Sequence, residues 1–225
     1  MAPLNVHFLD ARGTLTQLRD WLETTLARTH ERASKLMLLP PLDVVVKAGA
    51  HVIPEKGHLG YAPDAGVIYL TVDPGSPTLR ANHDASLERM FAHELHHAAR
   101  WQGPGYGASL GESLVSEGLA GHFAQEVCGG MPEPWEQLDP VDIQAYVAMA
   151  DAQWSLSGYD HAAWFFGAAD LPRWLGYSLG YRLVETFLSL HPASLASNLV
   201  QVDAQAFRRS LGAVCYPMDG HPFTG

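Results

Sequence analysis

The sequence of 225 residues is short of cysteine, short of basic residues and free of long apolar runs. Two cysteines, Cys128 and Cys215, are too few for a disulfide framework, so we expect reduced thiols. Lys and Arg total 14 against 24 Asp and Glu, a formal net charge of −10. This acidic balance argues against nucleic acid and against an anionic membrane surface as partners.

No apolar stretch approaches the roughly 20 residues that a membrane-spanning helix needs. The first residues also lack the basic stretch and apolar core of a secretory signal. We therefore expect a cytoplasmic protein that binds neither membranes nor nucleic acid.

Hydrophobic residues make up 47% of the chain, which is enough for the core of a single domain. Alternation of residue types predicts a strand at Leu4–Leu9, and runs of β-branched residues predict strands at Leu42–Ala48 and Gly66–Val72. Apolar residues at helical spacing predict helices over about 14–36, 86–101, 109–129, 139–154 and 172–190. Five residues are expected to cap helices, namely Thr14, Asp84, Ser109, Asp139 and Asp203. Strands first and helices after indicate an α+β domain, with an α/β lobe over about 1–103 and a helical lobe over about 104–225.

The helix predicted over Ser86–Trp101 carries the letters HELHH at positions 93–97, a match to H-E-x-x-H. Positions four apart on a helix lie within about 40° of each other, so His93 and His97 can hold one metal ion between them. This spacing is typical of zinc, one ion per chain, and Glu94 is placed to take a proton from metal-bound water. We expect His96 to lie near the site or at the surface without being a ligand.

The next predicted helix carries the candidate third ligand, Glu117, which follows His97 by 20 residues (117 − 97). A short turn rich in Gly lets this helix fold back on the first, and small residues such as Gly118 let the two backbones approach. Three protein ligands leave a fourth position for water, as in catalytic zinc sites. Alternatives for the third ligand are Glu112, Glu126 and, more remotely, His122.

Three segments carry a resemblance to a known family: HELHH, GYGASLGESLVSEGLAGHF and GYSLGYRLVETFL. They resemble a predicted zinc-dependent protease family of unknown function, over roughly Gly66 to Leu190. That family is similar to the gluzincins, in which the two His of HExxH and the Glu of a downstream E-x-x-A segment bind zinc. EGLA at 117–120 fits this pattern, so the resemblance implies the ligands His93, His97 and Glu117 in a zincin-like α+β fold.

Two other zinc classes fail on the residues present. A metzincin needs Gly three and His six residues after the second His, where this chain has Arg100 and Gly103. A deformylase-like site needs a Cys before the motif, but both cysteines follow it. Arg100 itself is expected either to pair with a carboxylate such as Glu112 or to be solvated.

The resemblance also implies groups that act on the substrate. By likeness to families with a Y-x-x-G helix after the ligand Glu, Tyr177 is favoured as the residue that stabilises the oxyanion, with Tyr181 in reserve. The alternative is that both tyrosines pack in the core. An edge strand should bind substrate as an added antiparallel strand, and Gly66–Val72 is the candidate unless it is an ordinary core strand.

Together these features predict a zinc metallopeptidase that hydrolyses peptide bonds of a peptide or protein substrate, with Glu94 as the general base. One rival is a zinc-binding but non-proteolytic regulatory or interaction protein on a zincin scaffold. The other is a globular protein in which H-E-x-x-H is accidental.

Overall fold

The structure is a computed structural model that describes residues 2–214. The chain divides into two compact units. Among the described residues, the first contains 2–106, 119–132 and 194–202, and the second contains 107–118, 133–193 and 203–214. Cys215 lies outside the described residues, while Cys128 is half-buried, and burial raises the pKa of its thiol to about 11.

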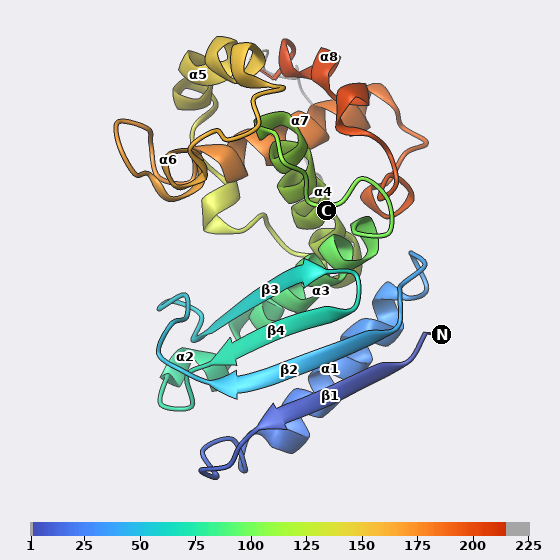
Figure 1. The fold of residues 1–225 in the computed structure, drawn as a ribbon, viewed down its shortest axis with the longest axis vertical. Helices are drawn as coiled ribbons and strands as arrows, with labels where there is room; N and C mark the ends of the chain where they lie inside the picture. The colour runs from blue at the N-terminus through green and yellow to red at the C-terminus, as the bar shows by residue number, and fades with distance from the viewer. Residues whose placement is uncertain (1, 215–225) are drawn as a thin grey trace. The chain divides into compact units, whose positions relative to one another are not determined.

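The first unit contains a four-stranded sheet in the order β1-β2-β4-β3 (Figure 1). Strands β1 (Leu4–Leu9), β2 (Leu42–Ala48) and β4 (Val67–Val72) run parallel, and β3 (His58–Asp64) pairs antiparallel with β4. The three predicted strands are thus confirmed. The sequence prediction missed β3, because Gly60 and Pro63 break the β-branched pattern of this segment.

The choice of edge strand was wrong. Strand β4 lies inside the sheet, with β2 on one side and β3 on the other, so it cannot pair with an added strand. A β-strand presents unpaired backbone groups only at the edge of its sheet, and β3 is the edge strand next to β4.

Helices α1 (Arg19–Ala33) and α3 (Ser86–Arg100) both lie behind the sheet in Figure 1. Strand β2 alternates buried and exposed residues over most of its length, as a sheet with one covered face requires. The covered face and the helices meet in a core of fully buried side chains, which includes Val44, Val46, Ile68, Leu70, Leu22, Leu26, Phe91 and Leu95.

Two predicted caps in the first unit are wrong. Helix α1 begins only at Arg19, because Asp10 accepts from the Leu15 N–H at 2.8 Å and organises a turn where Thr14 was expected to start the helix. Before α3, Asp84 has a φ of 54° and does not cap. The side chain of Asn82 accepts instead from the Leu87 N–H at 2.9 Å.

Helix α4 (Leu110–Cys128) begins with the predicted capping box. Oε2 of Glu112 accepts from the Ser109 N–H at 2.9 Å, and Oγ of Ser109 lies 3.4 Å from the Glu112 nitrogen. At its other end Arg32 donates to the Val127 carbonyl and Arg89 to the Gly129 carbonyl. Two cations at a helix C-terminus are favourable, because the last carbonyls carry partial negative charge.

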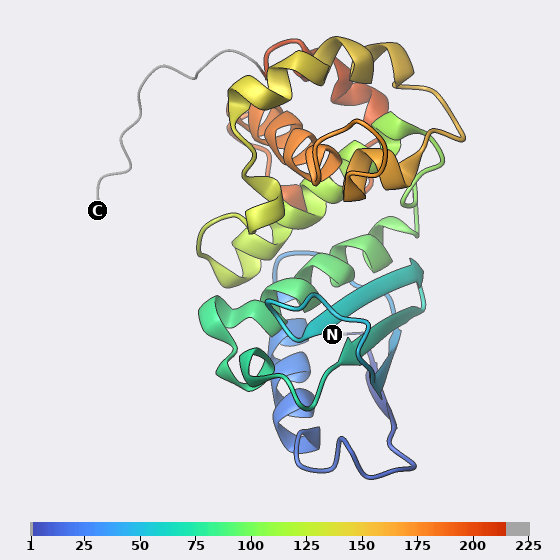
Figure 2. The ribbon, with the colours of Figure 1, turned by 90° about the vertical axis from the view of Figure 1, so that its left-hand side faces the viewer.

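The second unit is helical. Helix α7 (Leu175–Leu190) contacts α5 (Pro140–Gln153), α6 (His161–Phe166) and α8 (Arg208–Leu211), and Figure 2 shows α7 in orange between its neighbours. Asp139 caps α5 and Asp203 caps a single helical turn, as predicted. The four-stranded mixed sheet with a mostly helical remainder confirms the α+β class.

Gly118 allows a close crossing between α4 and α7, whereas the sequence predicted a close approach to the helix that carries HELHH. A Cβ on Gly118 would lie 2.1 Å from the Gly180 carbonyl oxygen of α7. A Cβ on Gly180 would in turn lie 2.3 Å from the Leu114 carbonyl oxygen. These glycines therefore let α7 pack directly against the backbone of α4.

Among residues 2–214, no helix combines the length and apolarity that crossing a bilayer requires.

Arg100 fastens the segment 194–202 to helix α3. Its side chain is 1% exposed, and Nη1 donates to the carbonyls of Val200 at 2.9 Å and Val202 at 3.0 Å. The expectation of a solvated arginine is therefore wrong. Buried cations are tolerated where carbonyl oxygens replace the lost water.

Replacing Arg100 with Met should lower the free energy of unfolding by about 2–4 kcal/mol, because two charge-assisted hydrogen bonds are lost and two carbonyls are left buried. Urea denaturation followed by circular dichroism measures the change. Arg12→Met, at an exposed turn position, is the matched control and should leave the midpoint nearly unchanged. Equal midpoints for the two variants would contradict the assigned role of Arg100.

Candidate metal centre

Helix α3 brings its two motif histidines together. Nε2 of His93 lies 3.0 Å from Nε2 of His97, and the ring centroids are 4.6 Å apart at an interplanar angle of 81°. Two nitrogens bound to one tetrahedral zinc at 2.0–2.1 Å would be about 3.3 Å apart. The two imidazoles are therefore already close to the spacing that a shared ion needs.

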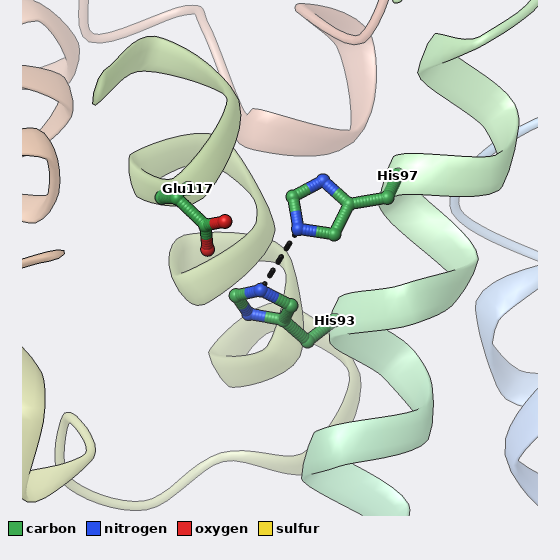
Figure 3. Close-up of side chains that lie close together, drawn as sticks. All are labelled: His93, His97 and Glu117. Atoms are coloured by element: carbon green, nitrogen blue, oxygen red, sulfur yellow. Dashed lines mark hydrogen bonds between the residues drawn. The ribbon is translucent and has the colours of Figure 1, made fainter. Parts of the chain in front are cut away.

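Glu117 of α4 completes a group of three possible ligands. One ligand atom from each of His93, His97 and Glu117 can be chosen so that all lie within 4.8 Å of one another. In Figure 3 the carboxylate of Glu117 and the two rings point toward a common space. Two imidazole nitrogens and one carboxylate oxygen form a donor set that suits zinc, so the residues present fit the metal that the sequence predicted.

The alternative third ligands are used elsewhere. Oε2 of Glu112 accepts from the N–H groups of Ala108 and Ser109, each at 2.9 Å, at the start of α4. The Glu126 carboxylate accepts from the N–H groups of Ala196 at 2.6 Å and Ser197 at 3.2 Å. His122 is half-buried and is not part of the metal-binding group found among residues 2–214.

The side chain of Glu94, a residue of α3, packs against the edge strand β3. The residue is 8% exposed. A Cβ on Gly60 would lie 2.6 Å from Cγ of Glu94 and 2.3 Å from Sδ of Met90. Glycine at position 60 therefore makes room for the glutamate, and this close approach explains a residue that is unfavourable inside a strand.

His96 belongs to the core. Its side chain is fully buried, Nε2 lies 3.4 Å from the Ala196 carbonyl oxygen, and the ring lies 5.5 Å from that of Phe123. Burial, with the nearby His97 and Arg100, holds the pKa of His96 well below its usual value, so the ring is neutral. The expectation that His96 is no ligand agrees with this position, but the surface location considered for it is wrong.

The two predicted tyrosines lie on α7 in different surroundings. Tyr177 is half-buried, and its ring lies 5.0 Å from that of Phe165 in an edge-to-face arrangement. Tyr181 is 4% exposed and belongs to the core of the second unit. Burial makes Tyr181 the less accessible of the two to a substrate.

The sequence prediction did not single out three polar aromatic residues that lie next to His97 or are linked by hydrogen bonds to the turn of α4 before Glu117. The ring of Tyr106 lies 5.4 Å from that of His97. Oη of Tyr159 donates to Oγ of Ser113 at 2.7 Å, and Nδ1 of His161 lies 2.9 Å from the same Oη. No sequence motif marks Tyr159 and His161, which follow α5 and lie far along the chain from HELHH.

Comparison with known proteins identifies the family of this chain. Residues 22–209 match the family described as "Predicted Zn-dependent protease (DUF2268)". The chain belongs to this family. The resemblance drawn from HELHH and the segment around Glu117 is thereby confirmed, and the family description names the metal that the donor set suits.

The DUF2268 chain is also similar to the uncharacterized protein YjfC of Bacillus subtilis (strain 168), with 26% identity over 174 residues. The alignment covers 70% of this chain and 56% of YjfC, so the chain spans little more than half the length of that relative. No solved structure matches the chain.

Removing any one of the three proposed ligands should weaken zinc binding by at least about 100-fold, because even residues that only support a ligand are worth 10–100-fold. We expect His97→Ala and Glu117→Gln to lose zinc after reconstitution and dialysis, as measured by elemental analysis, while the wild-type protein keeps about one ion per chain. His83→Ala and Glu23→Gln, both at exposed positions, are the controls. Stoichiometric zinc in both ligand variants would disprove the site.

Proposed function

We propose that this protein is a zinc metallopeptidase of the gluzincin type, built on a zincin-like fold. The observation that supports it most is the group of His93, His97 and Glu117 on two helices, with Glu94 next to His93 on α3. Mere retention of a metal does not need a glutamate at this position, whereas hydrolysis needs a base there. The intact H-E-x-x-H therefore favours a hydrolase over a metal-binding regulatory protein.

When bound, a zinc ion supplies Lewis acidity, which makes water nucleophilic near neutral pH and polarises a carbonyl group. In this proposal His93, His97 and Glu117 hold the ion. Glu94 takes the proton of the attacking water and later delivers it to the leaving amine nitrogen. Its packing against Gly60 limits its conformations, so that the carboxylate is positioned before the substrate arrives.

Strand β3 is the proposed substrate-binding strand. It is at the edge of the sheet, contacts α3 and includes Gly60 beside Glu94. A peptide added at a sheet edge makes backbone hydrogen bonds, which bring its peptide groups past the side chains of the neighbouring helix. We propose a peptide or protein as substrate, because the charge of −10 disfavours nucleic acid and anionic membranes. The proposed location is the cytoplasm.

Glu94→Gln should abolish most peptide hydrolysis without releasing zinc. The amide cannot accept the proton, so we expect kcat to fall by about 100-fold or more. Cleavage of a broad fluorogenic peptide library by the zinc-loaded protein, with zinc measured in parallel, tests this. Full peptidase activity in Glu94→Gln would contradict the mechanism. A wild-type protein that binds zinc but cleaves no peptide would favour the non-proteolytic alternative.

Gly60→Ala should reduce kcat by about tenfold or more, because the new methyl group displaces the side chains of Glu94 and Met90. The clash is with flexible side chains, so we expect the thermal midpoint to change little. Gly66→Ala, in the turn between β3 and β4, is the matched control, because the nearest atom there, Oδ1 of Asp64, is 3.4 Å from the added Cβ. Equal activity of the two variants would refute the steric role of Gly60.

A further inference from the structure

The segment between α5 and α6 is fastened to the first turn of α4. The Gly111 N–H donates to the Trp154 carbonyl at 2.9 Å, and the Leu110 N–H donates to the Leu156 carbonyl at 3.4 Å. An isolated antiparallel bridge joins Ser109 to Ser157. These backbone contacts hold the residues that follow, Tyr159 and His161, beside α4.

Tyr159 and His161 connect to α4 one turn before Glu117. Oη of Tyr159 donates to Oγ of Ser113 at 2.7 Å and lies 2.9 Å from Nδ1 of His161. Ser113 is fully buried, and residues four apart on a helix share a face. The hydrogen-bonded set of Ser113, Tyr159 and His161 therefore lies on the side of α4 that carries Glu117.

The ring of His161 has a defined orientation. It stacks on Phe165 with centroids 4.4 Å apart and an interplanar angle of 18°. Asp160 caps α6 by accepting from the Ala163 N–H at 2.9 Å, which holds the backbone next to His161. His161 and Tyr159 are both only half-buried, so a bound molecule can reach them.

The carboxylate of Glu117 acts on the pKa of both Tyr159 and His161. Burial holds the pKa of His161 below its usual value, although the carboxylates of Glu117 and Asp160 act in the opposite direction. Burial holds the pKa of Tyr159 above its usual value, opposed by the hydrogen bond with Ser113 and assisted by Glu117. The hydroxyl of Tyr159 therefore stays protonated and can donate a hydrogen bond at neutral pH.

We propose that His161 donates a hydrogen bond to a negatively charged oxygen bound beside Glu117, and that Tyr159 positions the ring for it. Because the hydroxyl of Tyr159 donates its hydrogen to Ser113, its oxygen accepts from the Nδ1–H of His161. A second proton on Nε2, stabilised by the anionic oxygen that the ring binds, is then the donated hydrogen. Under the proposed function, on which this inference rests, the oxygen is that of the tetrahedral intermediate, and His161 takes the role that the family resemblance implied for Tyr177.

Methylphosphonate, a small tetrahedral anion, is the probe. We expect His161→Leu to weaken its binding to the zinc-loaded protein by at least about tenfold, because an oriented donor to an anionic oxygen is lost. His161→Gln, which keeps an N–H donor, should restore part of the affinity. Isothermal titration calorimetry measures the binding, and zinc affinity should be the same in all variants.

His191→Leu is the matched control, since His191 stacks on Phe187 with centroids 4.1 Å apart at 22°, much as His161 stacks on Phe165. It should bind methylphosphonate as the wild-type protein does. Undiminished binding in His161→Leu, or equal loss in His161→Leu and His161→Gln, would overturn the donor role. In peptide assays the donor should affect kcat more than KM.

The outcomes separate this inference from the proposed function. Hydrolysis that depends on Glu94 but is unchanged in His161→Leu would overturn the donor role and leave the peptidase standing. Methylphosphonate binding that depends on His161, in a wild-type protein without peptidase activity, would support the donor and overturn the proposed activity. A wild-type protein that binds neither zinc nor methylphosphonate would overturn both.

Discussion

The burial of helix α3 is the constraint on which the rest of the first unit depends. Most of its 15 residues are buried, although the helix carries three histidines and two arginines. Polar groups leave water only where partners replace it. Arg89 and Arg100 therefore donate to backbone carbonyls of segments far along the chain, and these bonds bring residues 129–131 and 194–202 to the helix. His93 and His97 lie on another face of α3, and their rings point toward the same space as the carboxylate of Glu117 (Figure 3).

The glutamates of α4 show that surroundings, rather than residue type, decide what a carboxylate does. Glu112 accepts from N–H groups at the start of its own helix, and Glu126 accepts from two N–H groups near residue 196. Each of these carboxylates stabilises backbone donors that a turn would otherwise leave unsatisfied. Glu117, between them in sequence, belongs to the group with the two histidines. A carboxylate with backbone donors within reach is poorly available to a metal ion, which explains how one helix can contain three glutamates and a single candidate ligand.

Local patterns predicted much of the fold and the motif part of the candidate site. The strands β1, β2 and β4, the capping box at Ser109 and the start of α5 at Asp139 all depend on residues within a few positions of one another. The failures have a common cause in longer-range contacts. Gly60 made β3 look like a loop, yet its missing side chain accommodates Glu94. Asp84 looked like a cap, but Asn82 reaches the free N–H group of Leu87 instead. Competing side chains a few residues away cannot be ranked from sequence without the path of the backbone.

The sequence by itself determined that His93 and His97 share a helix face, because that geometry follows from the 3.6-residue period of a single helix. It also determined the family, through motifs that are read along the chain. Only the tertiary structure decided that β3 forms the edge, that His96 is buried, and that Tyr159 and His161 lie beside the turn that precedes Glu117. These relations join segments that are tens of residues apart. They depend on how the chain folds back on itself, and no local periodicity encodes that path.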